Sequence, residues 1–243
     1  MENEWKSKHV AVLGVGSVGS AVADMLARAG VRRLTLVDPD VLSEDNLKRH
    51  VLDDKDLGKS KVHALAAKYS PVYTNRQASL FVETHPIQKK FDAELFKPMV
   101  FHSDPGGRYE RSMKPDVIAA CVDSLACESQ INAYSLGKNV PVVYGGVHGD
   151  AHTAEIITVI PGLTPCYECY ERTGELPPPG QEHYTDPNHD PTKMPHQEGL
   201  WVDVLMAASL QVQAILGVLG YREKFPPLVL KSLRYPFKLE SFS

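Results

Sequence analysis

A glycine-rich segment near the amino terminus has the residue types and spacing of a phosphate-binding turn. Gly14, Gly16 and Gly19 follow the apolar run HVAVL and precede SAVADMLARAG, in which small apolar residues recur at helical spacing. Glycines let the backbone approach a phosphate, and the amino end of a helix favours an anion. Asp38 ends the next apolar run, where a carboxylate can accept hydrogen bonds from ribose hydroxyls. This pattern predicts a nucleotide site, for which NAD is the commonest ligand.

Charged and amide side chains are concentrated just after that second apolar run, in LVDPDVLSEDNLKRH and the DLGKSK that follows. NAD requires no further cations there, because the turn already binds its pyrophosphate. A triphosphate does require them, since arginine and lysine can hold the β and γ groups. The alternative for each basic residue is a solvated helix face. The candidates are Asp38, Asp40, Asn46, Arg49, Lys59 and Lys61.

Apolar runs that alternate with helical stretches must position these residues. We predict strands at 9–16, 33–38, 78–86, 116–123 and 140–146, and helices at 20–30, 59–69, 124–134 and 199–220. Strands separated by helices favour an α/β fold with a Rossmann-like, doubly wound, mostly parallel sheet.

The pattern changes after residue 150. Residues 153–162 predict a strand outside the alternation, which would extend the sheet in the antiparallel sense. Residues 174–197 are rich in Pro, His, Asp and Gly, and so long a loop is usually functional or mobile. We therefore expect one domain over 1–243. It has a nucleotide-binding half (1–150) and a half for carrier binding and dimerisation (151–243) with a crossover strap at 170–198.

Composition excludes several classes of protein. The chain is 43% hydrophobic and 23% charged, which is typical of a globular domain, and a net charge of -4 gives no argument for binding nucleic acid or a membrane. The apolar segment 199–220 is long enough to span a bilayer, but Asp203, Gln211 and Gln213 favour a buried core or dimer-interface helix. Four cysteines and a start without a signal-peptide pattern predict reduced thiols in the cytoplasm.

Taken in order, the motifs resemble those of the ThiF/MoeB/HesA superfamily, adenylation domains similar to the ubiquitin-activating enzyme. The likeness comprises LGVGSVGS, LTLVDPDVLSEDNLKRH, DLGKSK and CVDSLACESQIN. It continues through VPVVYGGVHG, AEIITVIPG, the CYEC after it and the apolar helix, over about residues 9–220. Several ordered motifs make this resemblance specific.

The resemblance implies a role for each candidate residue. The three glycines would form the ATP turn, Asp38 would bind the ribose, and Asp123 would hold Mg²⁺ near the α-phosphate. Asp123 lies at the carboxyl end of a predicted strand, where open sheets present ligands, and the alternative role is a helix cap. The triphosphate ligands implied are Asn46, Arg49 and Lys61, with Lys59 as an auxiliary.

The implied reaction is attack by a carboxylate on the α-phosphate of ATP, with release of pyrophosphate. The carboxylate would belong to a ubiquitin-like or sulfur-carrier protein that ends in Gly-Gly, and the enzyme would be a homodimer. Catalysis would consist of positioning and charge neutralisation by Mg²⁺, Arg49 and Lys61. The alternatives are adenylation of a peptide or a tRNA nucleoside, a non-catalytic scaffold and, more remotely, an NAD-dependent oxidoreductase.

Cysteine and arginine usage departs from the family pattern. Cys166 and Cys169 are half of a tetrathiolate zinc site, and the second pair is missing from the final segment LRYPFKLESFS. Histidines of the strap could complete the zinc site instead, or the two thiols could bind no metal. A truncated chain would also explain the missing pair. Since residues 170–197 contain no cysteine, adenylation without a thioester on this segment is the simpler prediction. No arginine precedes the first strand, so a partner subunit's arginine is missing or is replaced by Arg108 or Arg111, which lie in a predicted surface loop at 104–114.

Overall fold

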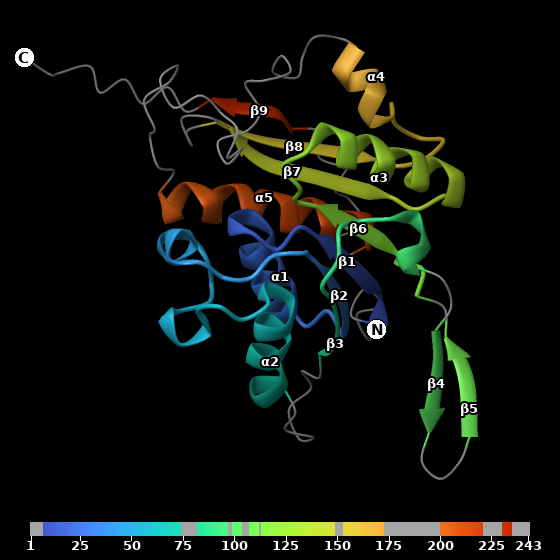
Figure 1. Ribbon diagram of the computed structural model, residues 1–243. Helices are drawn as coiled ribbons and strands as arrows, with labels where there is room; N and C mark the ends of the chain where they lie inside the picture. Colours follow the sequence, from blue (N-terminus) through green and yellow to red (C-terminus); the bar gives the residue numbers. More distant parts are fainter. Residues whose placement is uncertain are drawn as a thin grey trace, which may run out of the picture.

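The computed structural model describes residues 7–73, 82–96, 99–103, 107–111, 113–148, 153–172, 200–220 and 230–234. Within these ranges, seven strands form one sheet in the order β3-β2-β1-β6-β7-β8-β9 (Figure 1). The parallel strands are β1 (His9–Leu13), β2 (Arg33–Val37), β3 (Glu83–Ile87), β6 (Val117–Ala120) and β7 (Val142–His148). The antiparallel strands are β8 (Thr153–Val159) and β9 (Leu230–Arg234). The prediction of a doubly wound, mostly parallel sheet with an antiparallel extension is confirmed.

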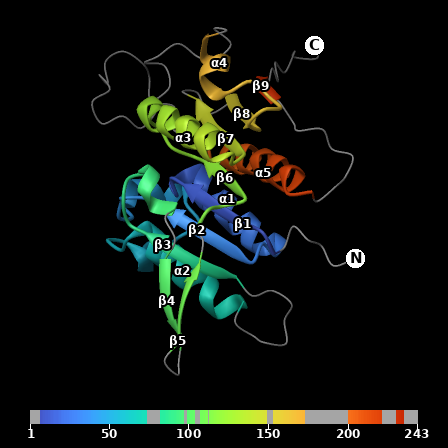
Figure 2. The ribbon, with the colours of Figure 1, turned by 90° about the vertical axis from the view of Figure 1, so that its right-hand side faces the viewer.

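Helices cover both faces of the sheet. One face carries α1 (Ser17–Ala29), α2 (Lys61–Tyr73) and α5 (Trp201–Val218). The other carries α3 (Leu125–Lys138), α4 (Tyr167–Arg172) and the short 3₁₀ helix η4 (Ala93–Phe96). Because side chains alternate along a strand, Val10 and Val12 of β1 enter the first core while Ala11 and Leu13 enter the second. Figure 2 shows α3 and α5 on opposite sides of the sheet.

A hairpin precedes β6 where the sequence predicts part of a surface loop. Strand β4 (Met99–Ser103) pairs with β5 (Gly107–Arg111) in the antiparallel sense. The two strands pair with each other and not with the main sheet, and they project away from it in both views (Figures 1 and 2). The loop prediction is therefore wrong for residues 107–111. Strands that lie outside the main sheet need not show the long apolar runs of a buried parallel strand, so the sequence carries a weak signal here.

The apolar helix near the carboxyl end is part of the core. By length and composition α5 could cross a membrane. It packs instead against α1 and against β6, β7 and β8, and Ala207, Ala208 and Ile215 are fully buried. Val202 and Met206 remain exposed on its other side. The preference for a core helix is confirmed, whereas the strap from residue 173 onward lies outside the described residues.

Candidate nucleotide site

The glycine-rich turn joins β1 to α1 and rests on the segment that follows β6. Gly14 has a φ of +79°, and its N–H donates to the carbonyl oxygen of Val37 at 2.8 Å. A Cβ on Gly14 would collide with the carbonyl oxygen of Cys121, and a Cβ on Gly19 would collide with that of Gly14. A Cβ on Gly16, by contrast, would meet nothing within 4 Å. Two of the glycines therefore close the turn, and the third borders open space.

Helix α1 begins directly after Gly16 and has no side-chain cap there. Gly16 is the N-cap residue, and as a glycine it has no side chain to cap the N–H groups of the first turn. The first turn also contains no acidic residue. Uncapped N–H groups at a helix start, together with the helix dipole, bind anions. Open space beside Gly16 and these free donors are what an ATP phosphate requires, so the residues fit this ligand.

Asp38 fixes the shape of the turn from the end of β2. Its side chain is buried, with Oδ2 accepting from the N–H of Val15 at 2.7 Å and Oδ1 from the N–H of Asp40 at 2.8 Å. Burial raises the pKa of the Asp38 carboxyl above its usual value, although both hydrogen bonds and Lys61 oppose that rise. A carboxylate has about four acceptor positions, so two remain for other donors. Its ribose role stays a prediction that this geometry allows.

Lys61 starts α2 and lies beside the same strand end. Its side chain is 8% exposed, and Nζ donates to Oδ2 of Asp40 at 3.2 Å. The Lys61 N–H also donates to the Asp40 carbonyl oxygen, at 3.1 Å. The Asp40 side chain, in contrast, is 63% exposed. An ammonium group that is buried except towards an exposed carboxylate is well placed to pair with a second anion, because little water competes for it.

His50 links the arginine-bearing segment to the turn, a role that the sequence did not reveal. It follows the 3₁₀ helix η2 (Glu44–Arg49) and is only 7% exposed. Nδ1 accepts from the N–H of Leu52 at 3.1 Å, so Nε2 carries the proton and donates to the carbonyl oxygen of Val15 at 2.8 Å. Burial lowers the pKa of His50 to about 4, which keeps the ring neutral at pH 7. This bond anchors the end of η2, where Arg49 lies, at the turn.

Asp123 lies in the segment that follows β6. The N–H of Cys121 donates to the carbonyl oxygen of Leu13 at 2.8 Å, which keeps this segment beside β1. Asp123 follows two residues later and is exposed, and α3 begins at Leu125 with Ser124 as its N-cap residue. Ser124, rather than Asp123, therefore takes the N-cap position of α3. An exposed carboxylate at a strand end suits a magnesium ligand.

Comparison with known protein families matches residues 2–234 to the ThiF family. The chain belongs to the ThiF family. Curated relatives include ubiquitin-like modifier-activating enzyme 5 of Drosophila simulans, 34% identical over 68% of this chain and 39% of that protein. The enzyme of the same name from Caenorhabditis briggsae is 30% identical over 68% of this chain and 36% of that protein. The chain thus spans well under half the length of these relatives.

Solved structures share the ThiF-family fold. The crystal structure of Escherichia coli MccB with ATP superposes with a TM-score of 0.68, at 21% identity, over 93% of this chain and 60% of that one. The crystal structure of PaaA gives a TM-score of 0.64 at 18% identity, over 93% of this chain and 59% of that one. At these identities the likeness establishes the fold.

Two further candidates for the ATP site of this ThiF-family chain, Asn46 and Lys59, form hydrogen bonds with residues close to them in the sequence. Oδ1 of Asn46 accepts from the N–H of Ser43 at 3.2 Å and so caps η2. Nζ of Lys59 is exposed and donates to Oδ1 of Asp56 at 3.0 Å. Hydrogen bonds join the turn, Asp38, Asp40 and Lys61, whereas Asn46 lies in η2 and Lys59 in the bend before α2. Their roles towards ATP stay predictions.

The paired thiols lie at the start of α4. The sulfur atoms of Cys166 and Cys169 are 3.2 Å apart, and the side-chain oxygen of Asn132 accepts from the N–H of Tyr167 between them. In the described part of the chain no group of three or more His, Cys, Asp and Glu side chains forms a metal site. The strap histidines His183, His189 and His196 lie outside the described residues. Zinc at this position stays a prediction.

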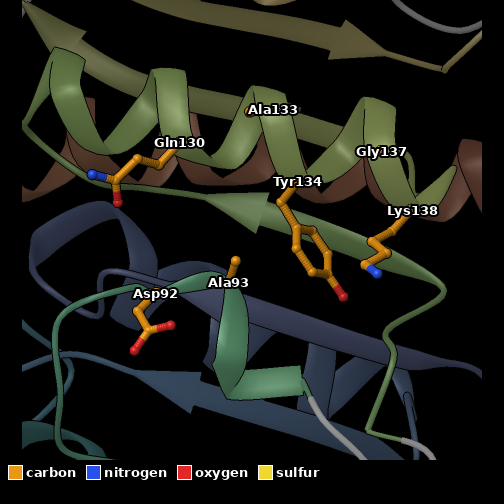
Figure 3. Close-up of a pocket in the computed structure, with 7 residues that line it drawn as sticks. All are labelled: Asp92, Ala93, Gln130, Ala133, Tyr134, Gly137 and Lys138. Carbon is orange, nitrogen blue, oxygen red and sulfur yellow. The ribbon is translucent and has the colours of Figure 1, made fainter.

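A separate hollow lies on the α3 face of the sheet. It is an open groove of about 540 Å³ between α3 and the segment that enters η4 (Figure 3). Tyr134 and Lys138 extend from α3 on the side of that helix where η4 lies, and Tyr134 also packs edge-on against Phe91. The groove is lined by the second half of α3, whereas Asp123 precedes the first. It contains none of the candidate ATP residues.

Proposed function

We propose that this chain adenylates the C-terminal carboxylate of a ubiquitin-like or sulfur-carrier protein, using ATP and Mg²⁺. The observation that carries the proposal is the glycine turn: Gly14 and Gly19 have no room for a side chain, whereas Gly16 borders open space and α1 starts beside it without a side-chain cap. The relatives named ubiquitin-like modifier-activating enzyme support a protein substrate. The structure of MccB with ATP supports the nucleotide.

The chain's own residues supply positioning and charge. The turn and the start of α1 would hold phosphate oxygens, and Asp38 would hold the ribose. Arg49 and Lys61 would neutralise the charge that develops on the triphosphate. Mg²⁺, held by Asp123, would add a further positive charge near the α-phosphate. An oxygen of the substrate carboxylate attacks the α-phosphorus, the bond to the β-phosphate breaks, and pyrophosphate leaves. No general base is required, because the carboxylate is ionised at pH 7.

The charges beside the turn separate this proposal from an NAD-dependent oxidoreductase. Asp38 alone suits either nucleotide. Lys61 is held beside Asp40, and His50 anchors the end of η2 that carries Arg49 at the turn. We expect Arg49→Ala to abolish adenylation, whereas an oxidoreductase would bind NAD and tolerate that change.

The proposal includes a homodimer. Val202 and Met206 are 57% and 40% exposed on α5, and Leu200 just before it is 62% exposed. Apolar side chains grouped on one side of a helix are typical of an interface. Analytical ultracentrifugation tests this part: Met206→Glu should shift a dimer to monomers, and a wild-type chain that sediments as a monomer would contradict it.

ATP–pyrophosphate exchange tests the activity. The purified chain is assayed with Mg²⁺ and candidate carriers ending in Gly-Gly, alongside Asp123→Ala and the control Asp54→Ala, an exposed carboxylate in the 3₁₀ helix η3 (Asp54–Asp56). We expect carrier-dependent exchange that Asp123→Ala loses and Asp54→Ala keeps. ATP binding without exchange for any carrier would overturn the protein substrate. Binding of NAD in preference to ATP would overturn the whole proposal.

A further inference from the structure

Gln211 is a fully buried amide in the middle of the apolar helix α5. Nε2 donates to the carbonyl oxygens of Ala120 at 3.2 Å and Val143 at 2.9 Å. Oε1 accepts from the thiol of Cys121 at 3.3 Å. Both amide donors and one oxygen acceptor position are therefore used. A buried amide without such partners is costly, so these bonds fix the position of the side chain.

The amide group of Gln211 fits closely against the backbone of β6 and β7. Ala120 is the last residue of β6, and Val143 lies on the adjacent strand β7, opposite Ala119. A Cβ on Gly145 of β7 would collide with the amide group of Gln211. The side chain thus lies across the carboxyl end of β6, and β7 has a glycine where the amide passes.

Cys121 connects this amide to the glycine turn. Its carbonyl oxygen is the atom that excludes a side chain at Gly14, and its own Cβ lies 3.1 Å from the position a Cβ on Gly19 would take. Burial raises the pKa of the Cys121 thiol to about 12, so the thiol is protonated and can donate to Gln211. Asp123 follows Cys121 by two residues. One amide on α5 therefore holds the residue on which the turn rests and the strand end that leads to Asp123.

We propose that Gln211 is a positioning residue for the ATP site. It belongs to the second half of the chain, and its hydrogen bonds go to Ala120, Val143 and Cys121 rather than to a candidate ATP ligand. It acts through Ala120 and Cys121. These residues determine how far the glycine turn lies from the end of β6 and in which direction the chain leaves that strand. This inference rests on the proposed function to the extent that it requires an ATP site at this turn. It does not require a particular carrier.

Gln211→Met tests the proposal, because it keeps most of the side-chain volume and removes both donors. The measurements are the dissociation constant for ATP with Mg²⁺, by calorimetry well below the melting temperature, and the melting temperature itself. Ile215→Ala is the matched control, since Ile215 is fully buried one turn away and has no polar atom. Gln213→Met controls for the chemistry of the substitution, because Gln213 is exposed on the same helix.

We expect Gln211→Met to weaken ATP binding at least tenfold. Ile215→Ala should lower the melting temperature to a similar extent, yet leave the ATP dissociation constant within twofold of wild type. Gln213→Met should change neither quantity. A structural glutamine with no role at the site would give the Ile215→Ala result, which would overturn the proposal.

Substitutions at Cys121 keep the test decisive if Gln211→Met does not fold. Cys121→Ser retains a donor to Oε1 and should bind ATP within twofold of wild type, whereas Cys121→Ala lacks it and should bind at least threefold more weakly. Equal affinities for the two variants would overturn the proposal. A wild-type chain that binds no ATP would overturn the proposed function and this inference together. ATP binding without carrier-dependent exchange would overturn only the carrier substrate.

Discussion

The site around β1, β2 and β6 and the region around α4 and α5 keep their shapes in different ways. At the site, backbone atoms set the distances: the Cys121 carbonyl oxygen meets Gly14, and Asp38 and His50 bond to the main chain of Val15. In the second region α5 packs mostly by apolar side chains, and Val202 and Met206 stay exposed. Backbone contacts leave no freedom to repack, whereas apolar contacts do. The site should therefore be the more easily broken by small changes.

The largest effect is expected at Gly19. In Gly19→Ala the new methyl group would collide with the carbonyl oxygen of Gly14, which is backbone and cannot turn aside. We expect a loss of stability of about 3 kcal/mol or more, seen as a lower midpoint in urea denaturation. Gly16→Ala is the matched control, because the added methyl group meets open space. It should keep the stability of wild type and weaken ATP binding, since the space it enters is where phosphate would lie.

A Gly19→Ala protein as stable as wild type would show that the turn is less tightly closed than the contacts indicate. Unchanged ATP affinity in Gly16→Ala would place the phosphates elsewhere. The two outcomes are independent, because one concerns folding and the other concerns the ligand.

Acid should weaken the site next, through His50. Burial lowers its pKa from 6.5 to about 4, so between these values the unfolded chain binds a proton that the folded chain does not. Stability contributed by the neutral ring is therefore complete above about pH 6.5 and decreases as the pH falls towards 4, by up to about 3 kcal/mol. Urea denaturation at pH 7.5, 6 and 5 measures the decrease.

His50→Gln is the control for this titration. Glutamine can still donate to the carbonyl oxygen of Val15 but binds no proton in this range. The pH dependence of wild-type stability minus that of His50→Gln should thus reproduce the histidine contribution. Parallel curves for the two proteins would contradict it, and would mean that the ring is hydrated rather than buried.

The sequence predicted the parts of the fold that local patterns encode. Short apolar runs alternate with helical stretches, so β1, β2, β6 and β7 and the helices after them lie within a few residues of their predicted positions. The glycine turn was predictable for the same reason, because its residues are consecutive. The sequence also placed Asp38 and Asp123 at strand ends, and the family motifs singled out Lys61, which starts α2.

The rest depends on tertiary contacts that no local pattern shows. His50 stands in the polar run NLKRH, and only its burial reveals a neutral ring bonded to Val15. Gln211 was evidence against a membrane helix, while its partners Ala120 and Val143 are 91 and 68 residues away along the chain. The hairpin β4–β5 and the edge strand β9 are defined by what they pair with. Separation along the chain hid the contacts of His50, Gln211 and β9, whereas the hairpin was missed because its strands lack a long apolar run.

The alkylation rates of the cysteines should differ by a factor of about ten or more between the buried thiols Cys121 and Cys127 and the pair Cys166 and Cys169 at α4. Burial raises the pKa of Cys121 to about 12 and that of Cys127 to about 11, so neither forms much thiolate. Burial opposes ionisation at Cys166 as well, but hydrogen bonds from Cys169 and neighbouring groups outweigh it and lower the pKa. Cys169 is exposed. We therefore expect iodoacetamide at pH 7.5 to modify Cys166 and Cys169 first, since the thiolate is the reactive form.

Mass spectrometry after timed quenching gives the four rates. Labelling of Cys121 at the rate of Cys169 would show that the strand end under the glycine turn opens to solvent. If Cys166 and Cys169 react only after a chelator is added, a bound metal protects them, which would support zinc at this pair.

The smallest effect on stability is expected at a glycine that neither closes a turn nor contacts a neighbouring segment. Gly137 lies in the last turn of α3, is exposed, and has nothing within 4 Å of an added Cβ. Gly137→Ala should raise stability by about 0.5 kcal/mol, because alanine loses less backbone entropy in a helix, and should leave ATP binding unchanged. The same substitution thus destabilises at Gly19, removes ligand affinity at Gly16 and stabilises at Gly137. A loss of ATP affinity in Gly137→Ala would instead mean that the groove on α3 is coupled to the ATP site, so that the groove and the site could not be treated as independent.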